Sequence, residues 1–156
     1  MANSVFQNIQ QLLEAEQVVF HTIEHAPTLT SEDSARERGE DISTGGKALV
    51  LKIDKNFHLF VISAAKKLNS KAVKKYFQAK KLRFATREEL LDLTGLVPGS
   101  VPPFGKPILD LALYVDTSIV ENEKIAFNAG SLTNSVIMQV DDYLRVAQPE
   151  VFTFSN

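Results

Sequence analysis

Apolar residues recur along the chain at helical spacing in some segments and as short β-branched or aromatic runs in others. The first segment opens at Ser4, which can cap a helix whose apolar positions are Val5, Phe6, Ile9, Leu12 and Leu13. Four more helices are expected at polar start signals, namely Thr30 with Asp33, Asn69 or Ser70, Thr86 with Glu89, and Asp141. Gly39 and Gly95 are placed to end two of them.

The remaining apolar runs predict strands at Val18–Ile23, Ala48–Ile53, His58–Ser63, Leu82–Ala85, Ile108–Val115, Lys124–Asn128 and Ser135–Val140. The second and third runs are separated by only a few residues, which is typical of a hairpin. Strands outnumber helices and the two kinds intermix. The pattern predicts one α/β domain of mixed α+β type over residues 1–156. Its central mixed sheet is largely antiparallel, or partly closed into a barrel, and helices flank it.

Composition is that of an ordinary globular protein, with 44% hydrophobic and 23% charged residues in 156. The absence of cysteine excludes disulfides, thiolate metal sites and a cysteine nucleophile. No apolar run approaches the roughly 20 residues that cross a bilayer, and the first ten residues lack the features of a signal peptide. We therefore expect a cytoplasmic protein without a membrane partner.

The charges are segregated along the chain, although the net charge is only −2. The segment from Lys55 to Arg87 holds ten Lys and Arg residues and no Asp or Glu, whereas the rest carries seven basic and all nineteen acidic residues. Such segregation gives one face a positive potential and favours a phosphate-rich partner. The alternative interpretation is a solvated, lysine-rich helix surface.

Prolines and glycines concentrate between Gly95 and Pro107, which holds four of the six prolines and three of the seven glycines. Proline fixes φ, and glycine permits close backbone approach, so the segment predicts a loop held in one shape. Its amide groups at Gly99, Ser100 and Gly105 could then face a ligand. The alternative is a structural turn that ends the preceding helix.

Two further segments at strand edges could join this loop in a pocket. In the first, Lys47 follows a glycine pair at a strand start, where it could aim its ammonium inward. In the second, a small-residue turn follows a strand and offers hydroxyl and amide groups from Ser131, Thr133 and Asn134. Together with the loop they could supply one cation, backbone donors and an aromatic wall at Phe104. Each segment taken singly is also what an unremarkable turn would contain.

The order of these segments resembles a known family. The runs GGKALVLK, GSVPPFG, IAFNAGSLTNSVIM and DYLRVAQPE are similar to those of the YbaK/prolyl-tRNA synthetase-associated editing-domain family, most of all its YeaK-like subgroup. The resemblance covers roughly Val18 to Phe152. Members are free-standing relatives of the proofreading insertion in bacterial prolyl-tRNA synthetases, and they hydrolyse the ester between a wrong amino acid and tRNA.

The resemblance implies roles for individual residues. Lys47, Gly99 and Gly130 match positions assigned to catalysis. The expected substrate-binding residues are Ser100, Pro102, Pro103, Phe104, Gly105, Asn128, Ala129 and Ser131. The expected tRNA-binding residues are Lys66, Lys67, Lys71, Lys74 and Lys75. The implied partner is the acceptor end of an aminoacyl-tRNA, with a synthetase as a second candidate, and neither DNA nor any metal or organic cofactor is expected.

One departure from the family bears on specificity. Alanine-specific members resemble HPLTN where this chain has GSLTN, so Gly130 stands where their histidine falls. Serine, threonine or another small amino acid is therefore as plausible a substrate as alanine. Two other hypotheses stay open: a binder of tRNA or synthetase that has lost hydrolysis, and a Schiff-base enzyme that uses Lys47.

The histidines do not predict a metal site. His21 and His25 are four apart, but in a strand such residues lie about 13 Å from each other. His58 is expected at a hairpin edge. At the mouth of the pocket, the candidates are Thr30, Ser31 and Ser43, because they lie near predicted loop ends.

Overall fold

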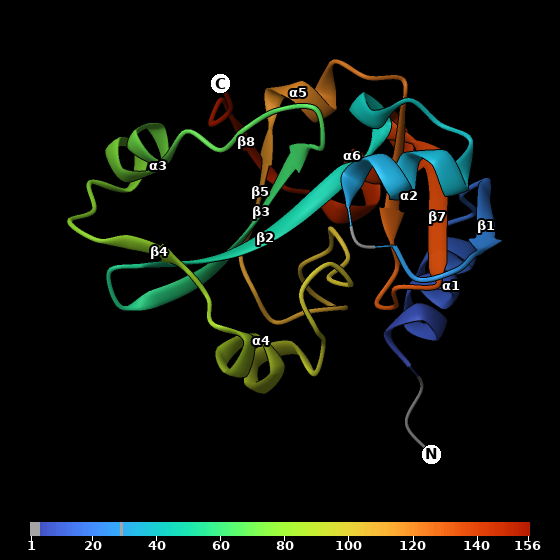
Figure 1. The fold of residues 1–156 in the computed structure, drawn as a ribbon, viewed down its shortest axis with the longest axis horizontal. Helices are drawn as coiled ribbons and strands as arrows, with labels where there is room; N and C mark the ends of the chain where they lie inside the picture. The colour runs from blue at the N-terminus through green and yellow to red at the C-terminus, as the bar shows by residue number, and fades with distance from the viewer. Residues whose placement is uncertain (1–3, 29) are drawn as a thin grey trace.

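Over residues 4–28 and 30–156, which the computed structural model describes, the chain folds into two sheets flanked by helices (Figure 1). The smaller sheet has the order β1–β7–β6, with β1 at Phe20–Glu24, β6 at Lys124–Asn128 and β7 at Asn134–Gln139. The larger has the order β4–β2–β3–β5–β8. Its strands are β2 (Gly46–Ile53), β3 (Asn56–Ser63), β4 (Leu82–Phe84), β5 (Leu113–Asp116) and β8 (Glu150–Phe152). The expected mixed α/β architecture is confirmed, and these strands form no closed barrel.

The two sheets meet at the start of β2. A parallel bridge joins Gly45 to Ala126 of β6. A methyl group on Gly46 would lie 2.6 Å from Cδ1 of Ile125, so glycine lets the two sheets pack closely here. The pair Gly45 and Gly46 therefore permits close packing, rather than the flexibility that the sequence suggested for aiming Lys47.

Local start and stop signals place most helices where the sequence predicts them. Ser4 and Thr86 each form a capping box, and Gly39 and Gly95 end their helices with positive φ. The helices are α1 (Val5–Ala15), α2 (Ser31–Arg38), α3 (Ser70–Phe77), α4 (Arg87–Thr94), α5 (Thr117–Val120) and α6 (Val140–Ala147), with a 3-10 turn, η1, at Ile42–Thr44.

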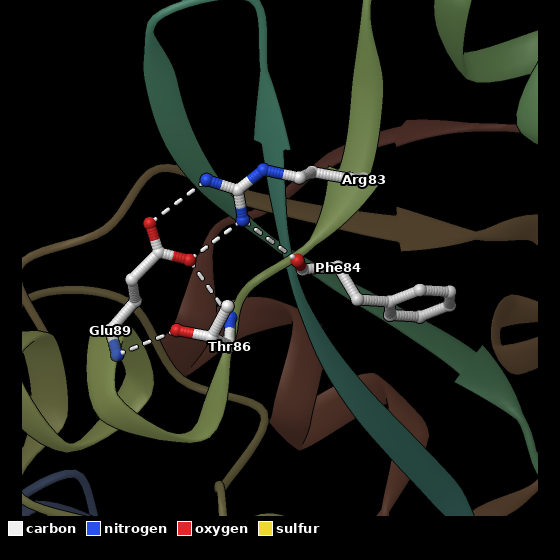
Figure 2. Close-up of polar contacts among 4 residues, drawn as sticks. All are labelled: Arg83, Phe84, Thr86 and Glu89. Carbon is white, nitrogen blue, oxygen red and sulfur yellow. Dashed lines mark hydrogen bonds and ion pairs between the residues drawn. The ribbon is translucent and has the colours of Figure 1, made fainter.

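A salt bridge ties the edge strand β4 to α4 (Figure 2). Arg83 donates to both carboxylate oxygens of Glu89, at 2.7 and 2.9 Å, and Glu89 also accepts from the amide of Thr86. Hydrogen bonds from Arg83 and the Thr86 amide lower the pKa of Glu89 to about 2. The side chain of Phe84 points away from this network and is 55% exposed.

Two apolar cores cover the two faces of the larger sheet. The major core joins α1, α6, the smaller sheet and one face of β2 and β3, where Val50 and Val61 point inward. The minor core lies under α3, where Val73 packs with Leu51, Phe60 and Phe154. Adjacent residues of β2 thus belong to different cores, as strand geometry requires.

Differences from the predicted elements are confined to short or irregular segments. The strand expected at Ile108–Val115 begins only at Leu113, because the backbone before it is irregular. The sequence analysis missed α5, η1 and β8, each three or four residues long. No helix in residues 4–28 or 30–156 is long and apolar enough to cross a membrane.

Candidate active site

A cavity of about 390 Å³ opens where the start of β2 meets the proline-rich loop. Its walls come from segments that are far apart in the sequence. The lining residues are Thr28, Thr30, Ser31, Ser34 and Arg38 from the α2 region, Gly45 to Leu49 and Ala64 from the larger sheet, Pro98, Gly99 and Val101 from the loop, and Asn128. The cavity therefore lies at the junction of the two sheets, with α2 along one side.

The charge on this cavity is positive. Arg38 and Lys47 are its cations, and no lining residue is acidic. Neither side chain is in any ion pair with the residues that the structure describes. Burial lowers the pKa of Arg38 to about 10, so the guanidinium remains protonated at neutral pH. A partly buried guanidinium without a counter-charge, such as that of Arg38, is costly to keep, and such groups gather at functional sites. Together with the exposed Lys47 it suits an anionic ligand.

Neutral acceptors fix the guanidinium of Arg38 in place. Its Nε donates to Oγ of Ser135 at 2.9 Å, and its Nη2 donates to Oδ1 of Asn128 at 3.0 Å. The hydroxyl of Ser135 also lies 2.8 Å from Nε2 of His25. These bonds orient the fork of Arg38 without neutralising its charge.

Asn128 holds Gly99 of the loop in place. Its Nδ2 donates to the carbonyl oxygen of Gly99 at 2.8 Å, while its Oδ1 accepts from Arg38. Gly99 has φ +88°, a conformation that favours glycine. Within the described ranges, no protein acceptor pairs with the Gly99 amide. Gly99 thus lines the cavity together with two cations and carries an amide that is free to donate to a ligand.

Hydroxyl groups line the α2 side. Ser31, Ser34 and Arg38 lie three and four positions apart and so fall on one face of the helix. The hydroxyls of Thr28 and Ser34 are 2.7 Å apart and share one hydrogen bond. Because only one hydrogen is used between them, the pair retains a hydroxyl hydrogen to donate. This wall can bind a small polar group.

The structure brings three of the residues singled out from the sequence, Lys47, Gly99 and Asn128, to the cavity. Thr30 and Ser31 also line it, as expected for its mouth. Ser43 does not, and its carbonyl oxygen instead accepts hydrogen bonds from Ser63 and Asn122.

Apart from Pro98, Gly99 and Val101, the proline-rich loop does not line the cavity. Phe104 is 1% exposed and packs edge-on against Phe127 and Tyr143, so it forms part of the core and not an aromatic wall. Tyr143 donates a 2.6 Å hydrogen bond to the carbonyl of Pro103. The amide of Ser100 is used within a turn, bonded to the carbonyl of Val97. The expected ligand contacts that are buried here are Ser100, Pro102, Pro103, Phe104 and Gly105.

The small-residue turn after β6 is likewise structural beyond Asn128. The amide of Gly130, expected to be catalytic, donates to the carbonyl of Ser100 at 2.9 Å. A methyl group on Gly130 would lie 2.6 Å from Val5, so this residue packs against α1. Ala129 is fully buried, and Ser131 pairs with Thr133 and Asn134. None of the three residues that follow Asn128 lines the cavity.

The lysines expected to bind tRNA are separate from this cavity. Lys66 and Lys67 are exposed in the connection between β3 and α3, and Lys71 and Lys75 are exposed on α3. Lys74 is half-buried and lines a second cavity near the far end of β2.

Sequence reasoning missed Arg38 and Ser34. The helix that carries them, SEDSARER, is polar on every side, so its pattern does not mark an inward face. The available signal was the spacing of Ser31, Ser34 and Arg38 along one side of a short capped helix. On such a helix, polar residues on the inward side indicate a solvent-filled cavity rather than an apolar core.

Comparisons with known proteins place the chain in a family. A model of the aminoacyl-tRNA editing domain matches residues 25–146. The chain is 34% identical over 154 residues to the multifunctional Ser/Thr-tRNA deacylase ProXp-y of Escherichia coli K12, covering 95% of this chain and 91% of that protein. It is also 34% identical over 100 residues to a proline–tRNA ligase of Shouchella clausii, a match that covers 64% of this chain and 17% of the ligase.

The fold has solved counterparts. A crystal structure of a protein proposed as a trans-editing enzyme for prolyl tRNA synthetase superposes with a TM-score of 0.84 at 22% identity, covering 100% of this chain and 99% of that one. A second, of hypothetical protein APE2540, gives the same TM-score over 95% of this chain and 99% of that chain. At such identities the likeness shows the fold.

Proposed function

The chain belongs to the family of aminoacyl-tRNA editing domains, and we propose that it is a trans-editing hydrolase that removes a small, wrongly attached amino acid from tRNA. The observation that carries the proposal is one cavity lined by Arg38, Lys47 and Gly99, in which neither cation has an ion-pair partner among the described residues. Such a site combines attraction for a nucleotide phosphate with a main-chain donor for a reacting carbonyl. We place the activity in the cytoplasm, where aminoacyl-tRNA is used.

The two cations bind the terminal nucleotide of the tRNA. Arg38 presents a planar guanidinium, which suits two-pronged contact with phosphate oxygens, and Lys47 adds a mobile point charge. Phosphate bound by these side chains would place the 3′-terminal ribose, and the ester it carries, next to Gly99. Binding of this kind converts the reaction with water into an oriented, effectively unimolecular step.

Hydrolysis proceeds by attack of water on the ester carbonyl carbon. The C–O bond to the ribose then breaks, the ribose oxygen takes a proton, and the free amino acid and the tRNA leave. A neighbouring ribose hydroxyl of the substrate orients the water. The amide of Gly99 donates to the oxyanion of the tetrahedral intermediate, and a single donor of this kind typically contributes about 2.7–4 kcal/mol.

The removed amino acid carries a hydroxyl group. The cavity wall formed by Thr28, Ser31 and Ser34 can pair with a seryl or threonyl side chain. The similarity to a Ser/Thr-tRNA deacylase supports the same assignment. A site that hydrogen-bonds a substrate hydroxyl discriminates strongly against analogues that lack it, whereas one methylene is worth only about 1–3 kcal/mol.

A panel of aminoacyl-tRNAs tests this function. Purified protein is mixed with tRNA charged with serine, threonine, alanine or proline, and release of the labelled amino acid is followed over time. We expect rapid release of serine or threonine and slow release of proline. If no amino acid is released while tRNA still binds, the protein is a non-catalytic tRNA binder rather than a hydrolase. Because a segment similar to this chain lies within a proline–tRNA ligase, the panel is repeated with a free synthetase of that kind present.

A further inference from the structure

A second cavity, of about 590 Å³, lies at the opposite end of β2 from the candidate active site. The end of β2, helix α3, the connection between α3 and β4, and β4 itself form its walls. Five cations line it, namely Lys52, Lys74, Lys80, Lys81 and Arg83, and Asp54 is the one acid among its lining residues. The cavity is therefore more strongly basic than the first.

Asp54 shapes this cavity and does not neutralise it by ion pairing. Its Oδ1 accepts hydrogen bonds from the backbone amides of Lys80 and Lys81, at 3.0 and 2.9 Å. The carboxylate thereby fixes the chain that presents these two lysines. Their ammonium groups, and those of Lys52 and Lys74, form no ion pair with any residue that the structure describes.

Arg83 differs from the lysines because Glu89 already neutralises it (Figure 2). The lysines are thus the charges available to an incoming anion. Lys52 also lies 5.6 Å from the centre of the Phe57 ring, which positions its ammonium at the surface of the sheet. Several unpaired ammonium groups around one hollow are the arrangement expected for phosphate binding.

The two cavities are joined by one straight strand. Lys47 lines the first and Lys52 lines the second, five residues apart on β2, which corresponds to about 17 Å. At 3.4 Å per nucleotide along one strand, this distance spans about five phosphates. The aminoacyl-tRNA proposed for the first cavity is a polyanion, and its backbone is long enough to reach the second. The phosphates of that same molecule are therefore the anions that this basic cavity suits, rather than an acidic peptide.

We propose that this second cavity binds backbone phosphates of the acceptor strand of the same aminoacyl-tRNA, about five nucleotides from the esterified end. The inference rests on the proposed function and extends it. It keeps Lys74 from the lysines expected to bind tRNA and replaces the exposed ones of the β3–α3 region by Lys52, Lys80 and Lys81. The two cavities act as two fixed points, which set the register of the acceptor strand along β2.

The test compares two substrates with one pair of variants. The first substrate is full-length aminoacyl-tRNA, and the second is a short aminoacylated oligonucleotide with the same 3′ end, too short to reach the second cavity. The variant Lys80→Gln/Lys81→Gln removes two charges and keeps the backbone amides that bind Asp54. The control variant, Lys106→Gln/Arg145→Gln, removes two exposed charges that line neither cavity.

For full-length tRNA, we expect kcat/KM of the Lys80→Gln/Lys81→Gln variant to fall about tenfold because KM rises. The slope of log kcat/KM against log salt concentration should decrease in magnitude by nearly two. The short substrate and the control variant should show no change. An equal loss on both substrates, or no loss on full-length tRNA, would overturn the proposal.

A direct binding measurement separates this proposal from the hydrolase assignment. Binding of uncharged tRNA is followed by fluorescence anisotropy for the wild type and both variants. If the wild type hydrolyses neither substrate, the hydrolase assignment fails, and a selective loss of tRNA affinity in Lys80→Gln/Lys81→Gln still supports the second site. Unchanged affinity in that variant refutes the second site whatever the hydrolysis result.

Discussion

Nη2 of Arg38 donates a 3.0 Å hydrogen bond to Oδ1 of Asn128, across ninety residues of sequence. The same asparagine holds the carbonyl of Gly99 through its Nδ2. One side chain therefore sets both a cation that we assign to substrate phosphate and the loop amide that we assign to the oxyanion. Errors in its position would disturb binding and chemistry together.

Asn128→Ala removes both of these hydrogen bonds. We expect kcat for deacylation to fall by about a hundredfold, because small displacements of a positioned donor cost that much. The measurement is single-turnover hydrolysis, with circular dichroism to confirm folding. A folded variant whose kcat is within twofold of the wild type would remove Asn128 from the mechanism.

Lys47→Ala should abolish deacylation and leave the fold intact. Lys47 is exposed and has no ion-pair partner in the described residues, so its removal leaves no buried group unpaired. We expect kcat/KM to fall at least a hundredfold, because loss of the phosphate contact misplaces the ester next to Gly99, and a displacement of about 1 Å can cost that much. Lys106→Ala serves as the control. Undiminished turnover by Lys47→Ala would contradict the assignment.

Ser34→Ala tests the hydroxyl wall. Loss of one hydrogen bond that leaves a substrate hydroxyl unpaired costs about 1–3 kcal/mol, or about fivefold to 160-fold in kcat/KM. We expect this loss with seryl-tRNA and little change with alanyl-tRNA. Thr153→Val, which does not line the cavity, is the matched control. Equal losses on both tRNAs would argue for a general structural effect.

Gly130→Ala distinguishes a structural from a catalytic glycine. The added methyl group would overlap Val5, and φ of +79° is strained for alanine. We expect a loss of about 1–3 kcal/mol in the free energy of unfolding. Activity per folded molecule should stay close to that of the wild type. A stable but inactive variant would return Gly130 to the catalytic group.

His58 should make stability depend on pH. It lies among the rings of Phe60, Phe77 and Tyr114, and burial lowers its pKa. The unfolded chain, with an ordinary pKa near 6.5, then binds the proton more readily. The free energy of unfolding should decrease as pH falls below about 6.5, by at most about 1.4 kcal/mol per pH unit.

The His58→Phe variant provides the comparison. It removes a buried Nδ1 that has no hydrogen-bond partner in the described residues. Urea unfolding between pH 5 and 7 should therefore show a flatter profile than the wild type. Parallel profiles for the two proteins would show that another group carries the pH dependence.

Local signals in the sequence were sufficient for most elements. Ser4, Thr30 and Thr86 cap helices by bonding amides three residues ahead, and this chemistry needs no distant partner. The glycine-rich start of β2 and the turn after β6 also marked Lys47 and Asn128 correctly as neighbours of one cavity.

In irregular segments, the side chains that point inward could not be predicted in the same way. Residues 99–105 have no period, so nothing in their order tells that Phe104 packs between Phe127 and Tyr143. Arg38 is recognisable only once Asn128 and Ser135 lie beside it, because its own helix is polar all round. The roles of such residues depend on tertiary contacts between segments that are far apart in the sequence.

The seam where Gly46 meets Ile125 bears on how this scaffold could acquire a new substrate preference. A side chain at position 46 would have to displace that of Ile125, so this side offers little room for adaptation. The wall formed by α2 consists of side chains on a short, polar helix, where one residue can be exchanged without moving its neighbours. We expect evolution or engineering to change the substrate specificity through positions 31 and 34, while the joined strands remain a rigid scaffold.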